Sequence, residues 1–115
     1  MDYKISIIIR TYNEIKHIKE VMESINRQDY KNYEIIVVDS ESNDGTVEVA
    51  KKYGAKIVGI RKSDFDYSYA SNIGVENASG DVVCFLSGHS VPAHDNYLSK
   101  INEVFHNDKI GRLLW

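Results

Sequence analysis

The sequence predicts an α/β fold in which four β-α units surround a mainly parallel sheet. Four short runs of apolar, largely β-branched residues recur along the chain without alternating with polar residues, which is typical of strands buried on both faces. Between these runs, apolar residues recur at the spacing of one helix face. Strands and helices that alternate in this way favour parallel pairing through right-handed crossovers. A chain of 115 residues with this pattern is expected to form a single domain, residues 1–115.

The apolar runs place the expected strands at residues 5–9, 34–38, 56–60 and 82–86. Each run is about five residues long, a common length for strands in globular proteins. Cys84 falls inside the last run, where a free cysteine is expected to pack as a small hydrophobic residue. Because it is the only cysteine, no internal disulfide forms, which favours a reducing compartment.

Capping residues and apolar spacing predict four helices. Asn13 and Ser42 are expected to begin the first two, because such side chains accept hydrogen bonds from the free amides of a first turn. Gly54 and Gly80 are expected to end the second and third, because glycine adopts the left-handed conformation that closes many helices. The apolar stripes lie at residues 15–25, 46–53, 69–77 and 98–105.

The composition excludes several function classes. The chain has 14 Lys and Arg against 17 Asp and Glu, which leaves no excess of positive charge to neutralise the phosphates of a nucleic acid. No apolar run approaches the roughly 20 residues of a membrane-spanning helix, and the first residues do not open a signal peptide. We therefore expect a cytoplasmic protein. The chain ends on the apolar residues 113–115, which suggests an interrupted rather than a finished domain.

Polar residues follow all four expected strands. In an open parallel sheet, ligands bind outside the carboxyl ends of the strands, so these segments are expected to share one rim. The segments are Arg10–Glu14, Asp39–Thr46, Arg61–Asp66 and Ser87–Ser90. Within them Arg10, Arg61 and Lys62 could pair with a diphosphate or remain solvated surface charges.

Three features of this rim allow two interpretations each. Asp39 ends a strand, where its carboxylate could accept N–H groups from the edge of a base or could cap the following turn. Tyr12 could stack on a base or close the edge of the core. Residues 42–46 open a helix whose free amides could hold a phosphate or form an ordinary capped turn.

The four histidines lie at positions that suggest different roles. His89 lies in the loop after the last strand, where it could ligate a metal or serve only the structure. His94 is expected to begin a helix together with Asp95, as a polar surface residue. His17 and His106 are expected on helix surfaces, and we assign them no function.

Missing motifs exclude or disfavour three related folds. A dinucleotide-binding unit needs a glycine-rich turn after the first strand, and residues 10–13 contain no glycine. The phosphate-binding P-loop sequence is absent. A receiver domain is disfavoured, because it would need an acidic pair after the first strand to hold magnesium beside Asp39.

Several segments together resemble the opening of family 2 glycosyltransferases with the GT-A fold. They are Ser6–Glu14, Gln28–Tyr30 and Glu34–Thr46, and the Val-Val-Asp…Ser-x-Asp-Gly-Thr block is specific. Residues 65–74, followed by 78–81, are similar to the branch that contains bacterial rhamnosyltransferases and other surface-polysaccharide enzymes. The resemblance runs from Lys4 to Leu98 and implies a Rossmann-like GT-A fold for nucleotide-diphospho-sugar transferases.

This resemblance implies binding of a nucleoside-diphosphate sugar of the UDP or dTDP type. Tyr12 and Asp39 would hold the base, with Thr11 and Glu14 in the same pocket. Asp66 and Asn72 would face the diphosphate and the sugar. The full implied set is Thr11, Tyr12, Glu14, Asp39, Asp66, Asn72 and Ser87.

Two positions depart from the family pattern. Ser40 stands where many members have a second aspartate. His89 stands in the slot of the metal-binding aspartate of the family's Asp-x-Asp motif, or of the Gln-Asp of the rhamnosyltransferase-like branch. A neutral imidazole can ligate Mn²⁺ but prefers softer ions than Mg²⁺. We therefore expect either a variant site in which His89 ligates a divalent ion, Mn²⁺ or Mg²⁺, or a diphosphate held by cationic residues.

The reaction implied by the resemblance is sugar transfer from the nucleotide donor to a hydroxyl of a glycan or lipid-linked acceptor. Its setting would be bacterial surface-polysaccharide synthesis, at the inner face of the membrane. Family members continue past Trp115 into a half that binds the acceptor and supplies the catalytic base, so we expect a truncated, donor-binding part. The alternative is a catalytically inactive module of the same fold that binds nucleotide sugars or other proteins.

Overall fold

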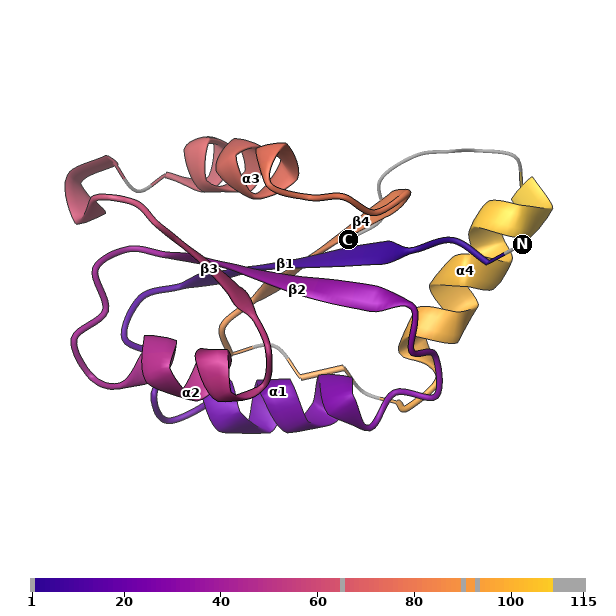
Figure 1. The fold of residues 1–115 in the computed structure, drawn as a ribbon, viewed down its shortest axis with the longest axis horizontal. Coiled ribbons are helices and arrows are strands. Elements are labelled where there is room, and N and C mark those ends of the chain that lie inside the picture. The colour runs from indigo at the N-terminus through magenta and orange to yellow at the C-terminus, as the bar shows by residue number, and fades with distance from the viewer. Residues whose placement is uncertain (1, 65, 90, 93, 109–115) are drawn as a thin grey trace.

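A computed structural model describes residues 2–64, 66–89, 91–92 and 94–108, which form a four-stranded parallel sheet in the order β3-β2-β1-β4 (Figure 1). The strands are β1 (Ile5–Thr11), β2 (Tyr33–Asp39), β3 (Lys56–Gly59) and β4 (Val82–Ser87). All four expected strands are confirmed, and three of them extend further than the apolar runs. The apolar ending at residues 113–115 lies outside the described residues.

The central strand β1 explains why the apolar runs do not alternate with polar residues. Ile7 pairs with Ile35 of β2 on one side and with Cys84 of β4 on the other. Successive side chains of a strand point to opposite faces, and both faces of β1 are covered. Ile7 belongs to the core cluster on one face and Ile8 to the cluster on the other, and both are fully buried.

Helices cover both faces of the sheet (Figure 1). They are α1 (Ile18–Asn26), α2 (Thr46–Lys52), the 3₁₀ turn η1 (Lys62–Asp64), α3 (Tyr67–Glu76) and α4 (Tyr97–Asp108). The core cluster that contains Ile7 includes residues of α1, α2 and α4, whereas α3 contributes Ala70 to the cluster around Ile8. Figure 1 shows α4 at the end of the sheet where the strands begin, opposite the loops that follow β1 and β2. Within the described residues, no helix is both long and apolar enough to span a bilayer.

The predicted starts of the first two helices are wrong. The first helix begins at Ile18 with His17 as the N-cap residue, whereas Asn13 has a positive φ of 49° and accepts a hydrogen bond from the amide of Asn43. Ile15 accordingly lies before the helix and is 40% exposed. The second helix begins at Thr46, because Ser42 is held by Asp39 instead of capping the helix.

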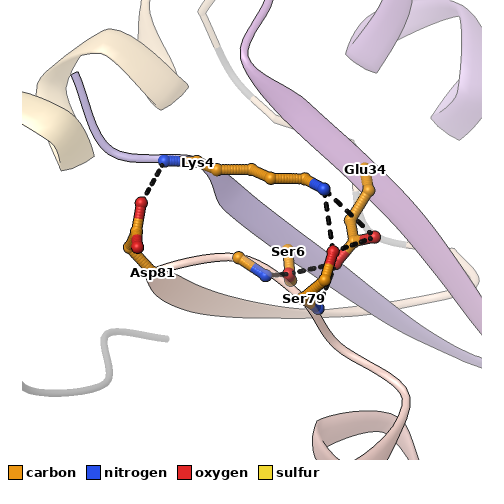
Figure 2. A network of polar contacts seen from close by, with 6 residues as sticks. Lys4, Ser6, Glu34, Ser79 and Asp81 are labelled. Carbon is orange, nitrogen blue, oxygen red and sulfur yellow. Dashed lines mark hydrogen bonds and ion pairs between the residues drawn. The ribbon is translucent and has the colours of Figure 1, made fainter.

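The two predicted helix ends have different outcomes. Gly54 adopts a φ of 85° directly after the C-cap residue of α2, which confirms the left-handed closure. Gly80 does not end α3, which stops at Glu76 with Asn77 as its C-cap. Instead, the amide of Gly80 donates to Ser6 Oγ at 2.8 Å in the turn before β4 (Figure 2).

His94 and Asp95 precede the fourth helix instead of beginning it. The carbonyl of Asp95 accepts a hydrogen bond from the amide of Asp29 at 2.8 Å, and the Gln28 side chain donates to the carbonyl of His94 at 2.9 Å. Because these carbonyls bond to the segment after α1, the backbone turns there before it can enter α4. A pocket of about 440 Å³ lies beside His94 and Asp95.

Close packing of α3 on β1 depends on Gly74. A Cβ atom at this buried position would lie 2.4 Å from Ile8 Cγ2 and 3.1 Å from Ile8 Cδ1. Ile8 is fully buried in the strand that pairs on both sides, so it has little room to move. The glycine therefore sets the distance between the helix and the sheet.

Replacing Gly74 with valine is expected to lower the free energy of unfolding by about 2–3 kcal/mol, because an overpacked core forces strained rotamers or a backbone shift. Urea unfolding followed by circular dichroism measures the change. The matched control is Glu76→Val, which introduces the same side chain at an exposed position of the same helix and is expected to cost less than about 1 kcal/mol. Equal losses in the two variants would contradict the packing argument.

Candidate functional site

The carboxyl ends of β1 and β2 are joined by a buried carboxylate. Thr11 Oγ1 and Ser42 Oγ each donate to Asp39 Oδ1 at 2.6 Å, and the Ser42 amide donates to Asp39 Oδ2 at 2.9 Å. Asp39 is 4% exposed and Thr11 is 1% exposed. The carboxylate therefore orders the turn after β2, which was one of its two predicted roles.

The loops after β1 and β2 also bind each other through their backbone amides. The Glu14 amide donates to Thr46 Oγ1 at 2.8 Å, and the Ile15 amide donates to Asp44 Oδ2 at 3.1 Å. Asp44 Oδ1 accepts from both the amide and the hydroxyl of Thr46. Desolvation raises the pKa of Asp44, but these hydrogen bonds outweigh it and hold the pKa below its usual value. Residues 42–46 therefore form a capped turn at the start of α2, which is one of the two roles predicted for this segment.

Tyr12 and Lys62 connect the loops after β1 and β3 across the end of β2. Lys62 Nζ donates to the Tyr12 hydroxyl at 2.6 Å, and the Lys62 amide donates to Glu41 Oε2 at 2.7 Å. The Tyr12 ring is 38% exposed and is not among the aromatic residues packed on the core. The sequence suggested Lys62 as a diphosphate partner or as a solvated surface charge. Its contact with Tyr12 spans fifty positions and depends on the strand order.

Glu14 and His89 meet where the loops after β1 and β4 approach each other. The Gly88 amide donates to the carbonyl of Arg10 at 2.9 Å, and a Cβ at Gly88 would lie 2.6 Å from Glu14 Cγ. His89 Nδ1 lies 3.5 Å from Glu14 Oε2. The His89 side chain is 63% exposed and that of Glu14 is 19% exposed.

The structure adds His17 to this pair. Its ring centre lies 6.3 Å from that of His89, and its side chain makes no capping hydrogen bond to α1. His17 was expected on a helix surface and was therefore assigned no function. The proximity of His17 to His89 depends on the tertiary structure, and the sequence carried no signal for it. In the described ranges, no group of three or more His, Cys, Asp and Glu side chains could hold a metal ion.

The remaining predicted site residues lie toward the other face of the sheet. Asp66 is the N-cap of α3, and its Oδ1 accepts from the Tyr69 amide at 2.9 Å. Asn72 is exposed on the same helix. Ser87 ends β4 in register with Arg10. By strand alternation, Thr11 faces the α1 side of the sheet, so these residues and the Asp39 network lie on opposite sides of one edge.

This chain matches a family model, sequence relatives and solved structures. Residues 6–111 match the family model described as glycosyl transferase family 2. A relative from Methanococcus voltae is 38% identical over 98 residues, which cover 79% of this chain and 30% of the relative. That protein is named dolichyl N-acetyl-alpha-D-glucosaminyl phosphate 3-beta-D-2,3-diacetamido-2,3-dideoxy-beta-D-glucuronosyltransferase. The chain spans about a third of the length of this relative and of another, the glycosyltransferase AglE from Haloferax volcanii.

Two solved structures resemble the fold. Residues 1–349 of S. aureus TarS in complex with UDP-GlcNAc match with a TM-score of 0.77 and 26% identity, over 92% of this chain and 31% of that one. The mannosyltransferase PcManGT from Pyrobaculum calidifontis, in complex with GDP-Man and Mn²⁺, matches with a TM-score of 0.75 and 25% identity. That match covers 90% of this chain and 32% of the other. These likenesses confirm the predicted α/β fold.

Proposed function

Because the chain belongs to glycosyl transferase family 2, we propose that it is the donor-binding part of an enzyme that transfers a sugar from a nucleoside-diphosphate sugar to a hydroxyl acceptor. The observation that carries the proposal is the rim at the carboxyl edge, where the buried Thr11 and Asp39 form one network with the half-buried Ser42. The exposed Tyr12 ring, bonded to Lys62, lies at the same edge. Ligands of open parallel sheets bind at this edge.

The proposed base site consists of Asp39 and Tyr12. A carboxylate whose position is held by Thr11 and Ser42 is a preorganised acceptor for the N–H of a pyrimidine base. Tyr12 is 38% exposed, and Lys62 Nζ lies over its ring, 4.4 Å from the ring centre, so stacking of the base is proposed on the other face of the ring. Lys62 Nζ adds a positive charge beside Tyr12, which favours a diphosphate. We infer a donor of the UDP or dTDP type, and the similarity to a UDP-GlcNAc complex supports it.

On the other side of the sheet edge, Asp66, Asn72 and Ser87 are proposed to face the diphosphate and the sugar. At the same edge, on the side where Thr11 lies, His89 and Glu14 are proposed to hold a divalent ion, because an imidazole 3.5 Å from a carboxylate supplies both common classes of metal ligand. The similarity to a complex that contains Mn²⁺ supports this assignment. Such an ion would neutralise the charge that develops on the departing diphosphate.

In the proposed reaction, an acceptor hydroxyl attacks the anomeric carbon of the sugar, the bond to the nucleoside diphosphate breaks, and a carboxylate base takes the hydroxyl proton. The proposed base and acceptor site lie in the further length that the relatives have. A glycan or a lipid-linked molecule is the proposed acceptor, in bacterial surface-polysaccharide synthesis on the cytoplasmic side of the membrane. The second candidate, a module that binds without transferring, is favoured by the replacement of the metal-binding aspartate by His89.

Calorimetric titration with UDP-GlcNAc, a dTDP sugar and GDP-mannose, with and without Mn²⁺, tests the donor site. We expect a dissociation constant below millimolar for the pyrimidine donors. Tyr12→Ala is expected to weaken binding by about tenfold or more through lost stacking. The matched variant Tyr12→Phe keeps the ring, loses the bond to Lys62, and is expected to retain most of the affinity. If no donor binds, or if Tyr12→Ala binds like the unmodified chain, the assignment fails. Release of labelled sugar would separate an enzyme from a binding module.

A further inference from the structure

Glu41, in the turn after β2, has an uncommon backbone conformation. Its φ is 59°, and within the described residues Asn13 is the only other non-glycine residue with a positive φ. Asparagine tolerates the left-handed region because its side chain is short and polar, whereas a longer side chain is uncommon there. Such outliers persist where their surroundings hold them, and they cluster at ligand sites. The contacts of the Glu41 side chain indicate what this conformation serves.

The Glu41 side chain binds the loop after β3 across the end of β2. Its Oε2 accepts a hydrogen bond from the Lys62 amide at 2.7 Å. The backbone supports the same crossing, because the Ile60 amide donates to the carbonyl of Asp39 at 2.9 Å. Both contacts join the end of β2 to residues 60–62, and the side chain of Lys62 continues from there to the loop after β1.

Lys62 ends this connection at the proposed base site. Its Nζ donates to the Tyr12 hydroxyl at 2.6 Å and lies 4.4 Å from the centre of the ring. A lysine carries its charge on a flexible four-carbon stem, so the place of the ammonium depends on how firmly its backbone is held. The Glu41 carboxylate holds that backbone at the Lys62 amide.

We propose that Glu41 is a positioning residue for the diphosphate of the donor, and that it acts through Lys62, whose ammonium it keeps at the carboxyl edge beside Tyr12. This inference rests on the proposed function, which gives Lys62 the diphosphate as a partner. A carboxylate by itself repels a diphosphate, so charge alone predicts that removing Glu41 tightens binding. Positioning predicts the opposite, because an ammonium that must first be ordered contributes less to binding an anion. The two explanations therefore differ in sign.

Three substitutions at position 41 separate position from charge and from folding. Glu41→Gly loses the acceptor for the Lys62 amide, but glycine readily adopts a positive φ, so stability is expected to be kept. The affinity for UDP is nevertheless expected to fall by about fivefold or more, as in Glu41→Ala. Glu41→Gln keeps an oxygen for the amide and loses the charge, and it is expected to bind UDP at least as tightly as the unmodified chain.

NMR titration with UDP and with uridine measures these affinities, and urea unfolding measures stability. Uridine has no phosphate, so its affinity is expected to change by less than about twofold in every variant at position 41. Glu48→Ala removes another exposed carboxylate, in the first turn of α2, and as the matched control it is expected to change neither affinity by more than about twofold. Unchanged or tighter UDP binding in Glu41→Gly, or an equal loss of uridine binding, would overturn the proposal.

The contact between Lys62 and Tyr12 is measured without nucleotide, as the nuclear Overhauser effect between the Lys62 methylene beside Nζ and the Tyr12 ring protons. We expect this effect in the unmodified chain and in Glu41→Gln, and a clear reduction in Glu41→Gly. The full effect in Glu41→Gly would overturn this inference whether or not nucleotides bind. A reduced effect in Glu41→Gly, together with no UDP binding by the unmodified chain, would overturn only the proposed function.

Discussion

Replacing Asp39 with alanine is expected to abolish measurable donor binding, a loss of at least about a hundredfold, and to lower the free energy of unfolding by about 3 kcal/mol. In this variant the buried Thr11 hydroxyl loses the carboxylate that accepts its hydrogen bond. The amide and the hydroxyl of Ser42 lose the same acceptor. Buried donors left without partners each cost about 1–3 kcal/mol. Calorimetry with a UDP sugar measures the first effect and urea unfolding the second.

The Asp39→Asn variant separates the two roles of this carboxylate. An amide of the same shape keeps an oxygen for the Ser42 amide, and its NH₂ group can donate to the two hydroxyls, so most of the stability is expected to remain. Donor affinity is nevertheless expected to fall about tenfold or more, because the charged acceptor for the base is lost. Glu48→Gln, at an exposed position in the first turn of α2, is the control for a change of charge alone. Full donor affinity in Asp39→Asn would show that Asp39 only orders the turn.

Replacing Glu34 with glutamine is expected to destabilise the chain at pH 7 by about 2 kcal/mol and to have about half that effect or less at pH 3. Glu34 lies at the opposite edge of the sheet from the donor rim, in the network of Figure 2. It accepts from Ser6 Oγ at 2.5 Å and from the amide and hydroxyl of Ser79 at 2.6 and 3.0 Å. Lys4 Nζ lies 3.7 Å away and itself donates to Ser79 Oγ. The network joins the starts of β1 and β2 to the turn before β4.

The pH dependence follows from the pKa of Glu34. Desolvation raises this pKa, but the hydrogen bonds from Ser6 and Ser79 and the charge of Lys4 lower it more, from 4.5 to about 2. A lowered carboxyl pKa contributes stability that is present above pH 4.5 and is lost as the pH falls toward 2. The full shift would correspond to about 3 kcal/mol, which we reduce to about 2 because the side chain is 24% exposed and solvent screens it.

Urea unfolding of both proteins at pH 7, 5, 4 and 3 measures this dependence. The stability difference between the unmodified chain and Glu34→Gln is expected to shrink below pH 4.5. Glu48→Gln, at an exposed position in the first turn of α2, is the control and is expected to change stability by less than about 0.5 kcal/mol at every pH. A stability difference for Glu34→Gln that stays constant from pH 7 to pH 3 would contradict the linkage.

The residue pattern within single segments predicted the strands more accurately than the positions where the first two helices begin. The strands were found because burial on both faces demands continuous apolar residues, and that demand is visible in each segment alone. Asn13 and Ser42 were misread as helix caps, since a side chain that suits a first turn suits a contact between loops equally well. Only the pairing of β1 with β2 brings those loops together and decides between the two.

For the candidate site, the sequence by itself determined which residue types stand at the ends of the strands, and hence that Asp39, Tyr12 and His89 share one edge. Only the tertiary structure decided their partners. Asp39 is held by Thr11 and Ser42, and Tyr12 is bonded to Lys62. His17 joins Glu14 and His89 only because β1 and β4 are neighbours in the sheet. The physical reason is that strand periodicity is local to each segment, whereas strand order brings distant loops into contact and leaves no periodic trace in the sequence.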